Sequence, residues 1–86
     1  MARLIPAAER LTRAHALIQK ARDLPVPAET GKYDLGYIAK VKGLLQQARD
    51  LVKFIPYTPT ATPEMKAEVT QIFADADQAN HDILHG

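Results

Sequence analysis

The sequence predicts an all-α protein, an up-down-up three-helix bundle with coiled-coil-like packing. Three stretches carry apolar residues three and four positions apart. This spacing lines one face of an α-helix and would fall on both faces of a strand. Proline-containing segments separate the stretches, and short connectors between long helices favour antiparallel packing at shallow crossing angles. We predict helices at about 6–23, 34–55 and 63–84 in a single domain, residues 1–86.

The first helix is expected to begin near Pro6, because a proline at the first helical position loses no hydrogen bond there. The segment from Leu24 to Pro27 (Leu-Pro-Val-Pro) ends it, since proline cannot continue a helix. Its apolar stripe consists of Leu4, Ala7, Leu11, Ala14, Ile18 and Ala21.

The second helix has the most regular apolar stripe in the chain. Asp34 is its expected N-cap, and Pro56 is expected to end it after Ile55. The stripe consists of Ile38, Val41, Leu45, Ala48, Val52 and Ile55.

The third helix has the clearest start signal, Thr62 as N-cap followed by Pro63 at the first helical position. Its apolar residues repeat the same period and complete a core of three stripes. They are Met65, Val69, Ile72, Ala76, Ala79 and Ile83.

An internal similarity links the first two helices. Ala16–Leu24 and Gly43–Leu51 share six of nine residues in register, through either duplication or chance. Both segments carry leucines on the flank of the core stripe; Leu17 and Leu51 lie about 90° from the stripe centres. We expect this leucine flank to bind a second copy of the chain as a homodimer, or another helical protein. The flank consists of Leu17, Leu24, Leu44 and Leu51.

A second candidate docking face lies on the outer side of the second helix. Gly36 and Gly43 fall together there, and Phe54 projects towards the same side. A mid-helix glycine costs about 1 kcal/mol relative to alanine, so its presence favours the close approach of another backbone.

Charge is distributed unevenly, although the formal net charge is only +1. Residues 57–86 carry five acidic and one basic side chain, and both preceding thirds are basic. We expect the acidic third helix to neutralise its neighbours. The alternative is a weak nucleic-acid-binding protein that uses a basic ridge on the first two helices. That ridge consists of His15, Arg22, Lys42, Arg49 and Lys53.

Little in the sequence indicates catalysis. Ser and Cys are absent, and no glycine-rich phosphate loop follows a strand. Asp77, His81 and His85 have the spacing of metal ligands on one helix face, but no further His or Cys completes the coordination shell. We therefore predict no catalytic residue, no cofactor, no metal site and no small-molecule substrate.

No apolar run approaches the roughly 20 residues of a membrane span, and charges return too early for a signal peptide. These features favour a cytoplasmic protein. Together the observations predict a non-enzymatic helical bundle that acts by protein–protein contact, with self-association as its expected form.

Overall fold

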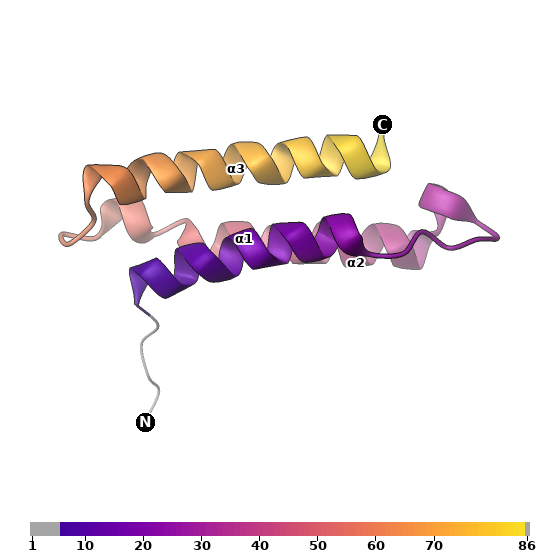
Figure 1. Cartoon of the computed structure of the whole chain (residues 1–86), viewed down its shortest axis with the longest axis horizontal. Helices are drawn as coiled ribbons and strands as arrows, with labels where there is room; N and C mark the ends of the chain where they lie inside the picture. Colours follow the sequence, from indigo (N-terminus) through magenta and orange to yellow (C-terminus); the bar gives the residue numbers. More distant parts are fainter. Residues whose placement is uncertain (1–5, 86) are drawn as a thin grey trace, which may run out of the picture.

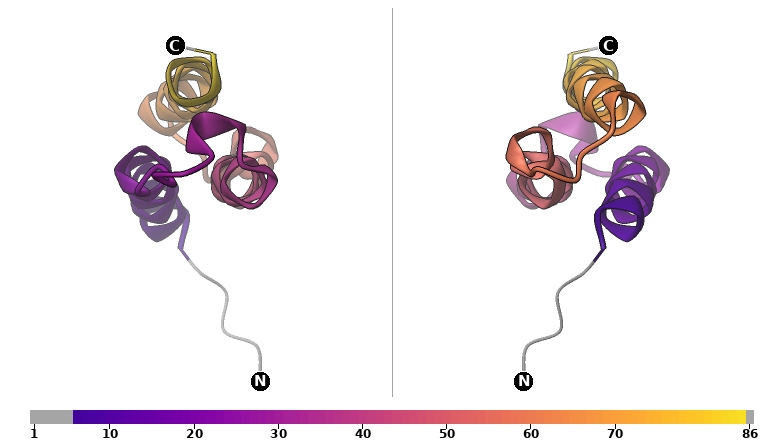
Figure 2. Two further views of the ribbon diagram at one scale, coloured as in Figure 1. Left: turned by 90° about the vertical axis from the view of Figure 1, so that its right-hand side faces the viewer. Right: turned by 90° about the vertical axis from the view of Figure 1, so that its left-hand side faces the viewer.

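Three antiparallel helices form the molecule, as expected from the sequence. The computed structural model describes residues 6–85, apart from the side chain of Lys32. Helix α1 spans Ala7–Asp23, α2 spans Leu35–Val52 and α3 spans Pro63–Leu84. They run up, down and up, and end-on they occupy the corners of a triangle (Figures 1 and 2). The predicted all-α three-helix bundle is confirmed.

The three predicted stripes meet in the centre of the bundle. Of the predicted stripe residues, Leu4 lies outside the described part of the chain, and Ala7, Met65 and Ile83 are partly buried against the core. At the start of α2 the prediction is wrong by one residue, because Tyr37 is buried and Ile38 only partly so. The buried centre consists of Leu11, Ala14, Ile18, Ala21, Tyr37, Val41, Leu45, Ala48, Val52, Ile55, Val69, Ile72, Ala76 and Ala79.

Side-chain caps set the beginnings of α2 and α3. The carboxylate of Asp34 accepts a hydrogen bond from the backbone N–H of Tyr37 at 2.9 Å. The hydroxyl of Thr62 accepts one from the N–H of Met65 at 3.1 Å. Both predicted N-caps are thereby confirmed, because each satisfies a backbone donor that has no partner inside its helix. Helix α1 begins one residue later than predicted, with Pro6 as its N-cap residue.

The end of α2 differs from the prediction by one turn. The helix stops at Val52, and Ile55–Tyr57 forms a separate short 3₁₀ helix, η2. Proline at position 56 explains the early stop, since its ring would clash with the carbonyl of Val52 in a continued helix. Ile55 still reaches the core, with 4% of its surface exposed.

The connector between α1 and α2 contains a second 3₁₀ helix, η1, at Gly31–Tyr33. Gly31 has φ +62°, in the left-handed region that favours glycine. Its N–H donates to the Pro27 carbonyl at 2.8 Å, and its own carbonyl accepts from the Asp34 N–H at 3.2 Å. This turn redirects the chain into the capped start of α2.

Small residues line much of the contact between the helices. Ala14, Ala21 and Ala48 on the first two helices, with Ala76 and Ala79 on α3, have no exposed surface. Alanines at these positions let helix axes approach closely. The four residues of the leucine flank lie at the margin of this core and are partly buried against it.

None of the helices within residues 6–85 is both long enough and apolar enough to cross a membrane.

Candidate protein-docking groove

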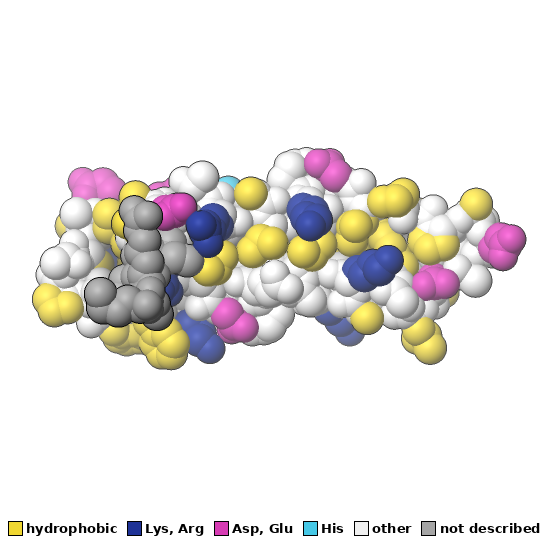
Figure 3. Space-filling model, turned by 90° about the horizontal axis from the view of Figure 1, so that it is seen from below, with side chains coloured by type: hydrophobic (Ala, Val, Ile, Leu, Met, Phe, Trp, Pro, Cys, Tyr) yellow, Lys and Arg dark blue, Asp and Glu magenta, His cyan; other side chains and the backbone are white. Residues whose placement is uncertain are grey.

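The face of the α1–α2 hairpin opposite α3 is open. Seen from that side, a row of apolar side chains runs along the molecule between charged residues (Figure 3). The leucine flank lies here, and all four of its members are partly buried and packed against the core. Because α1 and α2 are antiparallel, these leucines alternate between the two helices along the row, in the order Leu51, Leu17, Leu44, Leu24.

The row lies in a groove made of two adjoining depressions, with volumes of about 650 Å³ and 380 Å³. Lys20 and Gln47 line both depressions, so the groove is continuous. The larger depression is lined by Arg10, Arg13, Ala16, Leu17, Lys20, Gln47, Asp50 and Leu51. The smaller is lined by Lys20, Leu24, Ala39, Lys40, Gly43, Leu44 and Gln47. We call the whole feature the α1–α2 groove.

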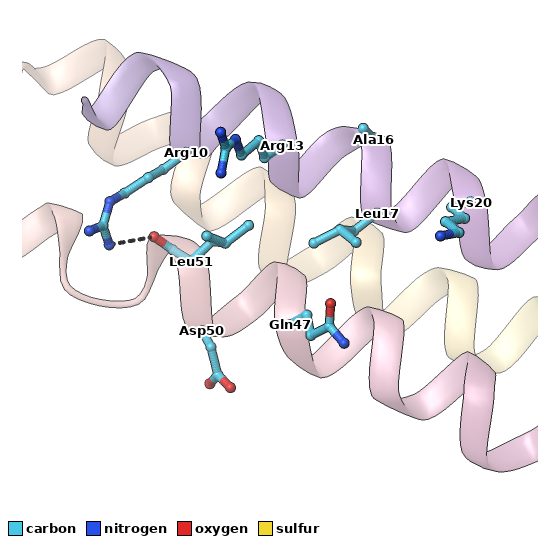
Figure 4. A pocket seen from close by; sticks show the side chains of 8 residues that line it. All are labelled: Arg10, Arg13, Ala16, Leu17, Lys20, Gln47, Asp50 and Leu51. Carbon is cyan, nitrogen blue, oxygen red and sulfur yellow. Dashed lines mark hydrogen bonds between the residues drawn. The ribbon is translucent and has the colours of Figure 1, made fainter. Parts of the chain in front are cut away.

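The close view of the larger depression shows which residues share a level along the helices (Figure 4). Leu17 from α1 and Leu51 from α2 point into the space between the helices, and Arg13 lies at the level of Asp50 and Leu51. At one end the Arg10 guanidinium donates a hydrogen bond across the groove to the Leu51 carbonyl at 3.4 Å. This contact joins the two helices at that end of the groove.

Gly43 of the predicted glycine face lies in the same groove as the leucines. A Cβ atom built on Gly43 would meet nothing within 4 Å, so packing inside the chain does not require glycine there. A Cβ on Gly36 would meet the Asp34 carboxylate at 3.2 Å. Gly36 borders a further depression that shares Leu24 and Lys40 with the groove. The two predicted docking surfaces therefore adjoin.

Phe54, the third residue of that predicted face, lies beyond the end of α2. Its side chain is 64% exposed, and the Lys53 ammonium is 5.2 Å from the centroid of its ring. Phe54 is not among the residues that line the groove.

The two walls of the groove differ in charge. The α1 wall carries three cations, Arg10, Arg13 and Lys20, of which Arg13 pairs with Glu9 of the same helix at 3.1 Å. The α2 wall carries Lys40 and the carboxylate Asp50. Within residues 6–85 neither Lys20 nor Lys40 forms an ion pair. The Gln46 amide and then the Lys53 ammonium hold the pKa of Asp50 below its usual value, so this carboxylate stays ionised.

The residues of the predicted basic ridge are mostly paired with α3. His15 lies 2.9 Å from Glu68, Arg22 lies 3.3 Å from Asp82, and the Arg49 guanidinium contacts Asp77. Arg22 and Arg49 thus form ion pairs with carboxylates of the acidic third helix, as expected from the charge distribution, and the His15 ring lies within hydrogen-bond distance of Glu68.

The same pairs divide the ridge into two edges. At about 100° per residue, Asp77 and Glu68 project from opposite sides of α3. Helix α3 therefore meets α1 with one edge and α2 with the other. Lys53 pairs with Asp50 at 3.3 Å, and Lys42 is exposed without an ion pair in the described part of the chain.

The metal-ligand spacing in α3 does not bring its residues together. Asp77 contacts Arg49, and the rings of His81 and His85 are 6.2 Å apart between centroids. In the region from 6 to 85, no three His, Cys, Asp or Glu side chains are grouped so that they could hold a metal ion.

Sequence reasoning missed the polar residues of the groove, namely Arg10, Arg13, Lys20, Lys40, Gln47 and Asp50. Their position in the groove follows from the relative height of α1 and α2, which the periodicity of each helix alone does not determine. No protein-family model matches this chain, and neither the curated proteins nor the solved structures include a match.

Proposed function

We propose that this protein is a non-enzymatic helical bundle that acts by protein–protein contact and self-associates through the α1–α2 groove. One observation carries the proposal: four leucines form a continuous row on the hairpin face that α3 does not cover. A second copy of the chain presents the same row, and a twofold axis would cover both rows at once.

Burial of the groove leucines would contribute to self-association. Complete burial of a leucine side chain contributes about 1.5–3 kcal/mol relative to full exposure. The groove leucines are already partly buried, so each adds only part of that amount, and a dimer would bury four from each copy. Association itself costs about 4–15 kcal/mol, which is of the same order as this gain.

Gly43 supports close contact at the groove. Glycine in the interior of a helix costs about 1 kcal/mol relative to alanine. Since a Cβ at this position would meet nothing within the chain, the glycine leaves space on the groove side of α2. A helix of a second copy would use that space.

The test is the mass of the protein in solution, measured by light scattering and sedimentation at micromolar concentration. We expect the native chain to be a dimer. The double variant Leu17→Glu/Leu51→Glu places carboxylates in the groove and is expected to be a folded monomer. Ala67→Glu/Ala74→Glu is the matched control, because it adds the same charge at exposed positions on α3. The control should dimerise like the native protein.

A native chain that is monomeric at micromolar concentration contradicts the proposal. Because Leu17 and Leu51 also contact the core, circular dichroism is needed to show that the double variant keeps its helices. Gly43→Leu provides a second variant, since it fills the groove without removing a core contact. A folded Gly43→Leu protein that dimerises as tightly as the native chain also contradicts the proposal.

Nucleic-acid binding by the basic ridge stays a prediction of lower rank, because His15, Arg22 and Arg49 already contact carboxylates of α3. Salt separates the two functions. Phosphate binding weakens steeply as salt rises, whereas apolar association does not.

A further inference from the structure

The charge asymmetry of the α1–α2 groove bears on how two copies would pair. A dimer that buries both grooves can form in two ways. If the twofold axis runs across the helices, α1 packs on α1 of the second copy and α2 on α2. If the axis runs along the helices, α1 of each copy packs on α2 of the other.

An axis along the helices keeps every residue at its own height. Residues that share a level within one copy then face each other between copies. The leucine row alternates between α1 and α2, so exchanging the helices brings each leucine opposite a gap in the facing row. Leu17 would enter between Leu44 and Leu51 of the second copy, and Leu44 between Leu17 and Leu24. This is the arrangement of knobs and holes in helix bundles.

The charges favour the same axis. Packing α1 on α1 would bring Arg10, Arg13 and Lys20 against the same three cations of the second copy. Packing α1 on α2 instead brings Arg13 next to Asp50 of the second copy, because these two residues lie at one level (Figure 4). Like charges at an interface act against one arrangement, and opposite charges select the other.

We infer that the dimer is a twofold assembly in which α1 of each copy packs antiparallel on α2 of the other, with Arg13 of one copy paired to Asp50 of the second. The inference rests on the proposed self-association. The four central helices then form an antiparallel bundle, and each α3 lies on its outside.

Charge reversal tests the pairing. Arg13→Glu alone brings two carboxylates together at both contacts, and Asp50→Arg alone brings two guanidinium groups together. Each single variant is expected to dissociate at least about tenfold more readily than the native dimer. An equimolar mixture of the two should restore the dimer. In the mixed dimer, the two substituted side chains face each other with opposite charges at one contact, and the native pair remains at the other.

Three outcomes separate the claims. A native monomer contradicts the proposed function and this inference together. A native dimer that depends on the groove leucines, while the mixed variants associate no more tightly than each alone, contradicts only the pairing. Single variants that dimerise like the native chain contradict the pairing as well.

Cross-linking gives a geometric readout that does not depend on charge. The chain has no cysteine, so introduced thiols report without background. Lys20→Cys and Gln47→Cys place one thiol on each wall of the groove. We expect a mixture to form disulfides between the two variants faster than within either. Faster cross-linking between two Lys20→Cys copies would show α1 packed on α1 and overturn the inference.

Discussion

The two faces of the α1–α2 hairpin differ in how completely their apolar side chains are buried and in how their charges are paired. On the face that α3 covers, alanines such as Ala14, Ala21 and Ala48 have no exposed surface, and ion pairs close both edges. On the groove face, leucines are partly buried between cations, two of which form no ion pair within residues 6–85. The covered face thus has its partner within the chain, and the groove face does not.

Apolar volume alone does not identify the inner side of a small bundle. Alanines such as Ala14 and Ala48 are buried beside Leu45, whereas the four leucines of the leucine flank lie at the margin of the core. A hairpin with apolar side chains on both faces is suited to lie between two other layers of helices. The following predictions test the two faces separately.

The largest effect is expected on the covered face. Leu45 has 1% of its surface exposed, so Leu45→Asp buries a carboxylate without a partner and should cost about 4 kcal/mol or more. We expect the domain to unfold, as measured by circular dichroism and thermal melting. Gln46→Asp on the exposed side of the same helix is the control and should remain folded. A cooperatively melting Leu45→Asp protein would mean that the core is placed on the wrong face.

A paired substitution on α1 compares the faces directly. Ala14→Leu adds volume where no surface is exposed and should cost about 1–3 kcal/mol. Ala16→Leu adds the same volume on the exposed groove side and should change stability by less than about 0.5 kcal/mol. Urea denaturation of both variants measures the difference. Equal destabilisation by the two substitutions would contradict the difference in packing between the two faces.

Gly43→Ala sharpens the description of the groove. A Cβ there meets nothing within 4 Å, so alanine should stabilise the helix by up to about 1 kcal/mol and raise Tm by about 4–8 °C. The measurement is made in the Leu17→Glu/Leu51→Glu background, where association does not contribute. At Gly36 the added Cβ would meet the Asp34 carboxylate at 3.2 Å, and we expect a smaller gain. A loss of stability at Gly43 would show a contact on that side.

The smallest effect concerns pH and the edge of α3. The Gln78 amide and then Arg22 hold the pKa of Asp82 below its ordinary value of 3.8. Its contribution to stability is therefore present above pH 3.8 and is lost as the pH falls below that value. Asp82→Asn should melt slightly earlier than the native protein at neutral pH, and the difference should shrink in acid. Glu29→Gln, in the exposed connector, should show no such pH-dependent difference.

The sequence predicts much of the bundle because period and capping are local properties. Asp34 and Thr62 cap helices where their spacing indicates, and Val41, Leu45 and Val52 are buried on the predicted stripe. Tyr37 is buried and Ile38 only partly so, and Pro25 and Pro27 of the connector border the same depression as Tyr37. That packing depends on the path of the connector, which periodicity does not describe.

The candidate groove is only partly accessible to sequence reasoning. The four leucines can be found because they flank two stripes at equivalent positions of an internal similarity. Whether these leucines and Gly43 line one open groove depends on how much of the hairpin α3 covers. The position of Arg13 beside Asp50 depends on the relative height of two helices, which tertiary contacts determine.

The ion pairs of α3 also favour one handedness of the bundle over the other. Helix α3 could in principle pack on either face of the hairpin, and the two topologies are mirror arrangements of the same three rods. On the groove face its edges would be exchanged, so Glu68 and Asp82 would be directed away from their partners on α1, and Asp77 away from its partner on α2. On the observed face, these two carboxylates contact His15 and Arg22, and Asp77 contacts Arg49. Exposed pairs that contribute little to stability can thus discriminate against a topoisomer that the apolar pattern alone would permit.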